Sequence, residues 1–373
     1  MARRLRILHV NDVAPGEGAG AEIYLGRLVA AQEAVGDTVH VVTGGGDKHG
    51  ARRLLDLWDP AARRSVAEAA REFRPDIIHV HNFLRELSPS VLDAVPGVPV
   101  VVTVHDLRVF GHGEHHLPDP RAVGDRLLLS PLARRQIRHH ASGVIAVSEA
   151  VADVVRAAGI GPVSVVGVPV LEPTASLRPP SQGADIVFAG RLSRDKGAHV
   201  LIDAFGQIAT EFPSARLVLL GDGPQRDALT AQAAPLRSRI DFRGWCSPED
   251  VSAAMATARA VVVPSLPGLR REGSSLAAAE AARHGRPVIG SNDPAVAEVV
   301  RAVGGEIVTS GDVRALARTL RRVLTEPAWA DVLGQAALFA ALDRYGCVSV
   351  TASVRETYLE VLRTSPTRIG VAA

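Results

Sequence analysis

Short runs of apolar, often β-branched residues recur along the chain, and amphipathic or Ala-rich segments separate them. Runs of this kind, bounded by turn-forming residues, are typical of strands that are buried on both faces of a parallel sheet. In the first half the predicted strands are 7–10, 39–42, 77–80, 100–104, 144–147 and 163–166, and the clearest predicted helices are 21–34 and 61–73. This alternation predicts a doubly wound α/β domain.

The pattern is interrupted at 169–184, which is rich in proline and has no apolar periodicity. Such a segment is typical of an interdomain linker. Alternation then restarts, with predicted strands at 185–189, 217–220, 240–242, 261–263, 287–289 and 307–308, a helix at 274–283, and helices from about 313 to the end, the last over 348–362. A chain of 373 residues can form two hydrophobic cores, so the sequence predicts two consecutive α/β domains.

Composition narrows the possible partners. Hydrophobic residues make up 47% and charged residues 22% of the chain, an ordinary globular balance. The net charge of +2 and the 4% of aromatic residues give no basic, base-stacking surface, so we expect no nucleic-acid partner. No apolar run approaches the ~20 residues of a membrane span and the N-terminus lacks the apolar core of a signal peptide, which leaves only peripheral membrane contact open. The sequence does not decide the oligomeric state.

The two cysteines, Cys246 and Cys347, are far apart and lack the spacing of metal ligands. We interpret them as free thiols in a reducing compartment, which predicts a cytoplasmic protein.

The stretch 261–298 reads as strand, loop, helix and strand, and Glu272 lies at the carboxyl end of the first strand. In an open α/β sheet ligands bind at this edge. The first helical amides lack intrahelical acceptors and carry the positive end of the helix dipole, so they predict a place for hydroxyl or phosphate oxygens. These amides belong to Gly273, Ser274, Ser275 and Leu276.

Glu280 follows Glu272 by eight residues, which is about 12 Å along a helix, too far for the two to share a proton. They could instead bond two sugars at the ends of one extended ligand, such as a nucleotide-sugar. Small apolar residues flank Glu280, and an acid in such surroundings is costly unless a polar group meets it. The alternative is an ordinary solvated glutamate.

This stretch, PS-x(6)-EG-x(6)-E-x(4)-GRPVI over 264–289, resembles the Glu-x7-Glu signature of the retaining glycosyltransferases of family 4, which have the GT-B fold. Three further stretches agree in order and spacing: AGRLSRDKG at 189–197, LVLLGDGPQRDAL at 217–229 and IDFRGWCSPEDV at 240–251. The N-terminal half resembles the family through GAGAE at 18–22 and TVHDLRVF at 103–110. One departure is Gly273-Ser274-Ser275, where the family usually has Gly-Phe-Gly, and it bears on the fit around the transferred sugar.

The resemblance implies two Rossmann-like α/β domains facing a cleft. It places an acceptor-binding domain at 1–170, a linker at 171–184, a donor-binding domain at 185–345, and a C-terminal helix at 346–373 that returns to the N-terminal domain. It also implies retaining transfer of a sugar, of the hexosyltransferase type, from a nucleotide diphosphate-sugar to a small-molecule or glycan acceptor. UDP is the favoured nucleotide. The displacement is front-face, and it needs no metal or other cofactor.

Arg191 and Lys196 follow the strand 185–189 and are five residues apart, so both can reach one anion. A planar guanidinium and a point charge suit two adjacent phosphates, and the resemblance implies that this pair holds the pyrophosphate. The alternative is a pair of solvated side chains.

A loop with Gly16, Gly18 and Gly20 follows the first strand, and its backbone can approach a ligand closely. The resemblance implies that this loop faces the donor phosphates and that Glu22 lies on the acceptor side. Gly16-x-Gly18-x-x-Ala21 also matches the dinucleotide fingerprint, but the second strand ends without the acidic residue that binds a ribose. An NAD(P) oxidoreductase is therefore the less favoured interpretation.

Gly221 and Trp245 lie in turns that follow two further strands. The resemblance implies that Trp245 and Cys246 lie against the nucleobase, and the alternative for Trp245 is a packing role.

His105 and Asp106 close the strand 100–104, and the resemblance implies a histidine near the reacting sugar, on the acceptor side. A metal at His112, His115 and His116 is an alternative, but these residues do not form a clear tetrahedral set. The sequence thus predicts a glycosyltransferase whose catalytic residues are His105, Arg191, Lys196 and Glu272. Its main rival is a catalytically altered relative that binds nucleotide-sugars or makes pseudo-glycosides.

Overall fold

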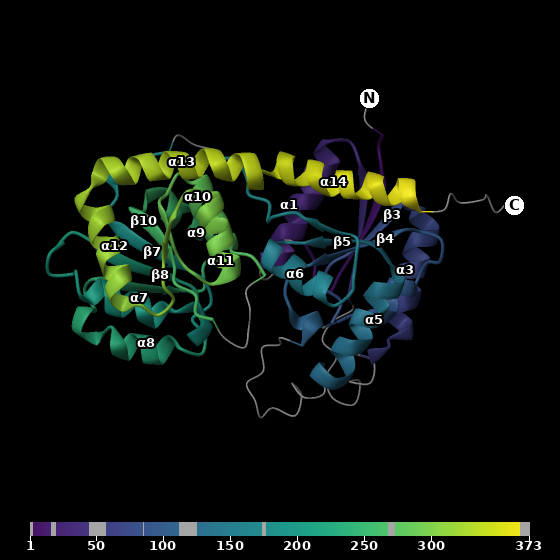
Figure 1. Cartoon of the computed structure of the whole chain (residues 1–373), viewed down its shortest axis with the longest axis horizontal. Coiled ribbons are helices and arrows are strands. Elements are labelled where there is room, and N and C mark those ends of the chain that lie inside the picture. The colour runs from purple at the N-terminus through teal and green to yellow at the C-terminus, as the bar shows by residue number, and fades with distance from the viewer. Residues whose placement is uncertain are drawn as a thin grey trace, which may run out of the picture. The chain divides into compact units, whose positions relative to one another are not determined.

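The computed structural model describes residues 3–15, 20–44, 57–84, 86–111, 125–173, 177–267 and 273–365. They form two compact units. The N-terminal unit takes in the described residues of 1–169, 269–273 and 347–373, and the C-terminal unit those of 170–268 and 274–346. Each unit is built on one six-stranded sheet with helices packed on it (Figure 1).

All strands of the N-terminal sheet are parallel, in the order β2-β1-β3-β4-β5-β6. The strands are β1 Arg6–Asn11, β2 Thr38–Thr43, β3 Ile77–Val80, β4 Val100–Val104, β5 Ala141–Ala146 and β6 Val163–Val165. The main helices are α1 Gly20–Ala34, α3 Pro60–Phe73, α5 Ser130–His140, α6 Glu149–Ala157 and α14 Cys347–Thr364. Every residue of β3 and β4 is buried, as the unbroken apolar runs of a sheet covered on both faces predict.

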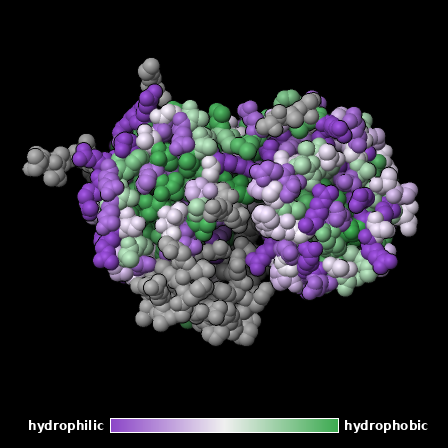
Figure 2. All heavy atoms as spheres, turned by 180° about the vertical axis from the view of Figure 1, so that it is seen from behind, coloured by the Kyte–Doolittle hydropathy of each residue, from purple (hydrophilic) through white to green (hydrophobic). Residues whose placement is uncertain are grey.

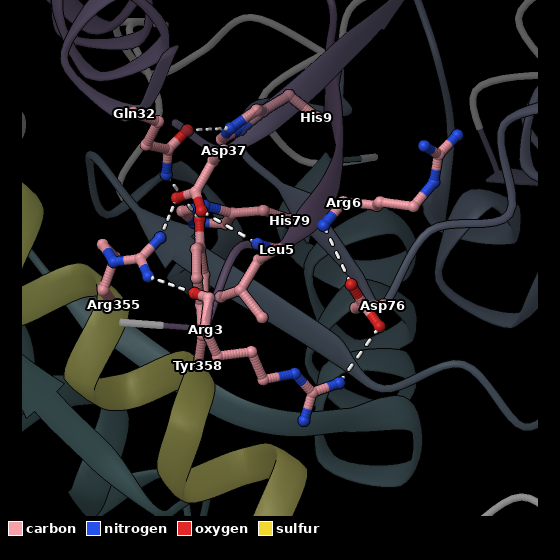
Figure 3. Close-up of polar contacts among 10 residues, drawn as sticks. All are labelled: Arg3, Leu5, Arg6, His9, Gln32, Asp37, Asp76, His79, Arg355 and Tyr358. Carbon is pink, nitrogen blue, oxygen red and sulfur yellow. Dashed lines mark hydrogen bonds and ion pairs between the residues drawn. The ribbon is translucent and has the colours of Figure 1, made fainter. Parts of the chain in front are cut away.

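The C-terminal helix α14 belongs to the N-terminal unit, where it packs against α1 and β5. Its attachment includes an ion pair between Arg355 and the fully buried carboxylate of Asp37, and a bond from Arg355 to the carbonyl oxygen of Arg3 (Figure 3). Asp37 also accepts a hydrogen bond from the backbone amide of Leu5 at 2.9 Å. The charge of Asp37 therefore has several partners, which a buried carboxylate requires.

The C-terminal sheet is also parallel throughout, in the order β12-β11-β10-β7-β8-β9. Its strands are β7 Asp185–Ala189, β8 Arg216–Leu220, β9 Ile240–Gly244, β10 Ala260–Val263, β11 Val288–Ser291 and β12 Glu306–Val308. Its helices are α7 Ala198–Gly206, α8 Arg226–Gln232, α9 Pro248–Thr257, α10 Leu276–Arg283, α11 Pro294–Ala302, α12 Val313–Thr325 and α13 Pro327–Tyr345.

The predicted α/β fold with two Rossmann-like domains is confirmed by these two sheets. Several predicted element boundaries were wrong by one to three residues, and two of these differences have a clear local cause. Helix α10 begins at Leu276 rather than at residue 274, because the Ser275 side chain is its N-cap and accepts a hydrogen bond from the amide of Ala278 at 3.3 Å. Strand β5 begins at Ala141, three residues earlier than predicted, with the polar and small residues Ser142 and Gly143 inside it.

None of the helices in the described ranges is long and apolar enough to cross a membrane. On the face that Figure 2 displays, hydrophilic residues are spread over the surface of each unit among apolar ones.

Candidate active site

The strand order of the C-terminal sheet reverses between β7 and β10. From β7 the chain continues outward to β8 and β9, whereas β10, β11 and β12 extend the sheet on the other side of β7. Ligands of open α/β sheets bind outside the carboxyl ends of the strands at such a switch point. The segments that leave β7 and β10 at this edge are the ones that carry Arg191 and Lys196 and the N-terminus of α10.

These two segments are packed tightly against each other. Gly197 has φ = 70°, and a Cβ atom at this position would lie 2.0 Å from the carbonyl oxygen of Pro264. The amide of Leu266 donates a hydrogen bond to the carbonyl of Asp195 at 2.7 Å. Only glycine fits position 197, and the turn that carries Lys196 is thereby fixed against the segment after β10.

Lys196 is half-buried and ends a single 3₁₀ turn, Arg194–Lys196, which precedes α7, whereas Arg191 is exposed. Gly197, in the left-handed conformation, separates Lys196 from the first turn of α7. Between the two cations lies Ser193, whose buried hydroxyl has no hydrogen-bond partner among the described residues.

A second such hydroxyl belongs to Ser274, just before the N-cap of α10. A buried hydroxyl without a partner costs about 1–3 kcal/mol. Two of them, both in segments at the switch point, indicate groups that a ligand could satisfy. The sequence did not single out Ser193, and no spacing signal distinguishes it from an ordinary loop serine.

Glu280 is buried at 8% exposure, so the alternative of a solvated glutamate is wrong. The polar group that meets it is Arg283, one turn later on α10, whose Nε donates to Oε2 of Glu280 at 2.7 Å. Arg283 also donates to the hydroxyl of Ser252 at 3.2 Å, and that hydroxyl is 2.9 Å from Nε2 of His284. Burial, with the nearby charge of Arg283, lowers the pKa of His284 to about 4, so its ring is neutral at physiological pH.

The turns after β8 and β9 are joined. Gly221 has φ = 133°, a Cβ atom on it would lie 2.0 Å from the carbonyl oxygen of Gly190, and its amide donates to the carbonyl of Gly244 at 2.7 Å. The Trp245 side chain is 77% exposed, so it does not pack into the core of this unit. Burial raises the pKa of the Cys246 thiol, whose sulfur lies 3.4 Å from the carbonyl oxygen of Gly244.

In the N-terminal sheet the strand order reverses between β1 and β3. Helix α1 begins at Gly20, and Glu22 lies buried in its first turn. Three predicted site residues, Gly16, Gly18 and Glu272, lie outside the described residues, as do His112, His115 and His116.

His105 follows β4 and is half-buried. Its carbonyl oxygen would lie 1.9 Å from a Cβ atom at Gly273, and the hydroxyl of Ser148 donates to the carbonyl of Gly273 at 2.6 Å. Gly273 groups with the N-terminal unit, so this contact between His105 and Gly273, two residues that were predicted separately, lies within one unit. The neighbouring Asp106 accepts bonds from the amide of Arg108 at 2.9 Å and from its Nε at 2.7 Å.

A small cavity lies beside His105 and Asp106, lined also by His81, Thr103 and Val109. Its volume of about 20 Å³ exceeds the roughly 10–15 Å³ that one water molecule requires. The cavity therefore has room for a water molecule but not for a sugar.

A cluster of buried histidines that was not predicted from the sequence lies next to His105. His9 on β1, His79 on β3 and His81 just after β3 have ring nitrogens within 4.8 Å of one another. Burial lowers the pKa of His9 to about 4 and the pKa values of His79 and His81 well below the ordinary value. The signal available was His-x-His in IIHVHN, since alternate residues of a strand face the same side.

Three neutral imidazoles at this spacing are a ligand set that a divalent metal could use. Each ring nitrogen of the three already has a hydrogen-bond partner in this structure, however. Metal binding would have to break several of these bonds, and the arrangement fits a hydrogen-bonded cluster better than a metal centre.

Comparison with known proteins gives matches over both units. Residues 18–170 match the family described as Glycosyltransferase Family 4, and residues 183–326 match the family described as Glycosyl transferases group 1.

Among curated proteins, glycogen synthase of Mycobacterium tuberculosis is 27% identical, over 79% of this chain and 70% of its own length. A 2-deoxystreptamine glucosyltransferase of Streptomyces kanamyceticus is 28% identical, over 74% of this chain and 75% of its own. Among solved structures, sucrose-phosphate synthase of Thermosynechococcus elongatus has a TM-score of 0.76 at 22% identity and covers 97% of this chain and 100% of that one. Anabaena HepE in complex with UDP and glucose has a TM-score of 0.69 at 20% identity and covers 95% of this chain and 99% of that one.

Proposed function

Since this chain belongs to the family 4 glycosyltransferases and has the GT-B fold, we propose that it is a retaining enzyme with a nucleotide diphosphate-sugar as its donor. The acceptor is a hydroxylated small molecule or glycan. UDP is the favoured nucleotide, because the HepE structures hold UDP, glucose or UDP-glucose.

The observation that carries the proposal is the composition of the switch point between β7 and β10. Two cations, Arg191 and Lys196, lie in a segment fixed against the one that leads into α10. The buried hydroxyls of Ser193 and Ser274 have no partner among the described residues of these segments. Cations, hydroxyl donors and the free amides of a helix N-terminus together bind a diphosphate well.

The proposed reaction is a front-face displacement without a protein nucleophile. As the bond from the anomeric carbon to the phosphate oxygen breaks, that oxygen takes the proton of the acceptor hydroxyl, and the acceptor oxygen bonds to the anomeric carbon from the same face. Arg191, Lys196 and the amides before α10 stabilise the charge that develops on the departing phosphate. These fixed cations take the place of a divalent metal.

We assign the remaining predicted residues to the donor or to the acceptor. Glu280 binds the ribose hydroxyls, with Arg283 holding its carboxylate in position. Glu272 aligns the transferred sugar, and the exposed ring of Trp245 is available to stack on the base. His105, Glu22 and Asp106 lie on the acceptor side.

The proposal is tested by thermal-shift measurements with UDP, GDP, dTDP and ADP and their sugars, followed by assays of nucleotide release. We expect a UDP-sugar to raise the melting temperature and transfer to persist in excess EDTA. Complete loss of transfer in EDTA, restored by Mg²⁺ or Mn²⁺, would contradict the metal-independent mechanism.

A second candidate function follows from Ser274 and Ser275, where the family usually has Phe and Gly. A catalytically altered relative would bind the nucleotide-sugar but release no nucleotide with any hydroxylated acceptor, or would couple a pseudo-glycoside. The same assays separate it from the transferase. An absorbance change with NAD(P)H would instead indicate the oxidoreductase that we disfavour.

A further inference from the structure

The buried histidines connect the C-terminal helix to the site through a continuous series of hydrogen bonds. We call this series the histidine chain; its members, from α14 to β4, are Tyr358, Gln32, His9, His81 and His105. Successive bonds measure 3.2 Å from Gln32 to Tyr358, 2.8 Å from His9 to Gln32, 2.9 Å from His81 to His9 and 3.0 Å from His105 to His81. Figure 3 shows its buried end, where Gln32 lies between His9 and Tyr358.

Because every ring is neutral, the bonds of the series must all run in the same direction. Burial lowers the pKa of His9 and His105 to about 4, and that of His81 further. A neutral imidazole has one N–H donor and one bare acceptor nitrogen. If one ring nitrogen in such a chain donates, the nitrogen of the next ring that faces it must accept, and the orientation passes from ring to ring.

The orientation begins at the amide of Gln32. Its Oε1 faces Nε2 of His9, which must therefore carry the proton, and Nδ1 of His9 accepts from Nε2–H of His81. Nδ1 of His81 in turn accepts from Nε2–H of His105. Nδ1 of His105 is then bare, and it has no hydrogen-bond partner among the described residues.

Tyr358 bonds the other side of the Gln32 amide and so takes part in setting its orientation. The amide nitrogen of Gln32 donates to the Tyr358 hydroxyl, which donates in turn to Nδ1 of His79 at 2.6 Å. Nε2–H of His79 donates to the hydroxyl of Thr103 at 2.6 Å. Turning the Gln32 amide over would reverse every bond of the histidine chain and leave the proton on Nδ1 of His105.

We propose that the histidine chain holds His105 in the Nε2–H tautomer, so that Nδ1 accepts a hydrogen bond from a hydroxyl of the bound sugar or acceptor. Tyr358, Gln32, His9 and His81 are then positioning residues, and only His105 touches substrate. The role of His105 toward a hydroxyl rests on the proposed function, whereas its tautomer does not. The charged and titratable groups that face His105 are Asp106, Arg108, His81 and Tyr24.

The tautomer is measured first, on the whole protein without ligand. Two-dimensional ¹H–¹⁵N spectra of histidine-labelled protein show which ring nitrogens carry protons. We expect His9, His81 and His105 all as Nε2–H tautomers, unchanged between pH 6 and 8. A proton on Nδ1 of His105, or titration of this ring near its ordinary pKa, would overturn the proposal whether or not the protein proves to transfer sugar.

The second experiment changes Tyr358, the member of the histidine chain that is farthest from His105. Tyr358→Phe keeps the buried ring and removes only the hydroxyl, and Tyr345→Phe on α13 is the matched control. Because the Gln32 amide then loses its preference between the two orientations, His105 is misoriented in about half of the molecules, and we expect kcat to fall about twofold, with an unchanged KM for the donor and a second set of His105 signals. A variant that melts earlier but retains the wild-type tautomer and kcat would show that Tyr358 is merely structural.

A pair of variants at His81 separates the hydrogen bond from the packing. His81→Phe fills the same space but cannot accept from His105, whereas His81→Asn offers an amide oxygen near the position of Nδ1. We expect Asn to restore the Nε2–H tautomer and most of the kcat that Phe loses. Equal kcat values and equal His105 spectra in the two variants would contradict the proposal.

Discussion

The two units differ in whether the buried polar groups near the carboxyl edges of their sheets have hydrogen-bond partners. In the N-terminal unit the buried polar side chains include His9, His79 and His81, and each ring nitrogen of these three is bonded within the unit. At the carboxyl edge of the sheet in the C-terminal unit, the segment after β7 carries the cations Arg191 and Lys196. The buried hydroxyls of Ser193 and Ser274 there have no partner among the described residues.

This difference indicates different roles. A network whose bonds are satisfied is rigid before any ligand arrives, and it can fix the direction of a donor or acceptor. Groups that lack partners lower the stability of the free protein and gain most when a ligand supplies the missing bonds. The carboxyl edge of the N-terminal sheet is therefore suited to orienting an acceptor hydroxyl, and the carboxyl edge of the C-terminal sheet to binding an anion.

The largest difference that we expect between the two units is in their stability at acid pH. A buried histidine whose pKa in the folded state lies below its unfolded value of about 6.5 makes the unfolded state bind more protons, so stability falls as pH drops from 6.5 toward 4. At pH 5 the His9 ring costs about 2 kcal/mol, and the lowered pKa values of His79 and His81 act in the same direction. Domains are stable by only about 5–15 kcal/mol, so this loss is large. We expect the N-terminal unit to unfold first on acidification.

Tryptophan fluorescence can follow this, because Trp58 lies in the N-terminal unit and Trp245 and Trp329 in the C-terminal unit. In a Trp245→Phe, Trp329→Phe background, Trp58 should report a transition between pH 6 and 4. Replacing the exposed His139 and His140 by Gln is the control and should leave its midpoint unchanged. A Trp58 transition only below pH 4 would contradict the acid-sensitive core.

The next largest effect is expected on nucleotide binding, at Arg191 and Lys196 of the C-terminal unit. A charge-assisted bond to phosphate contributes about 1.5–3 kcal/mol, so Lys196→Ala should weaken binding of the free nucleotide diphosphate at least tenfold and slow turnover. Arg191→Ala should act in the same direction. Calorimetric titration measures this, with Arg237→Ala, an exposed arginine of the same unit, as the control. Unchanged affinity in both single variants would remove these residues from the pyrophosphate site.

The sequence predicts the sheets well because a buried parallel strand leaves a continuous apolar run. Strands β3, β4 and β7 have the predicted bounds without change. The start of α10 was missed because a serine can continue a helix or cap it, and only the geometry of Ser275 decides.

The histidine chain could not be predicted in the same way. Its bonds join residues of β1, α1 and α14 and residues just after β3 and β4, which are far apart in sequence, and no period links them. Only His79 and His81 have a local signal, the His-x-His of a strand. The partner of Glu280 could have been predicted, however, because Arg283 follows it at the helical spacing of three residues.

The two glutamates of the signature should differ in what they bind. Glu280→Gln should weaken the bare nucleotide diphosphate about tenfold, since a ribose hydroxyl loses a charged acceptor, and should lower the melting temperature because Arg283 loses its counter-charge. Glu272→Gln should leave that affinity nearly intact and lower turnover, because alignment of the sugar matters most as the bond breaks.

Titration of both variants with the nucleotide diphosphate alone decides between them, with the exposed Glu249→Gln as the control. Loss of nucleotide affinity in Glu272→Gln together with its retention in Glu280→Gln would mean that the donor runs in the opposite direction.

The smallest expected effect concerns Ser274 and Ser275. It tests most directly whether the C-terminal unit holds an unpartnered hydroxyl that a ligand would bond. Ser274 and Ser275 are neighbours of the same type, but the hydroxyl of Ser274 is buried without a partner and that of Ser275 caps α10. Ser275→Ala should therefore destabilise the free protein by about 1 kcal/mol, the usual cost of a lost N-cap. Ser274→Ala removes an unsatisfied group and should raise the melting temperature slightly, while weakening the donor a few-fold, because a neutral hydrogen bond contributes about 0.5–1.5 kcal/mol. Opposite shifts of the free protein, measured by calorimetry, would support a hydroxyl held ready for the donor; a loss of stability in both variants would show that Ser274 already has a structural role.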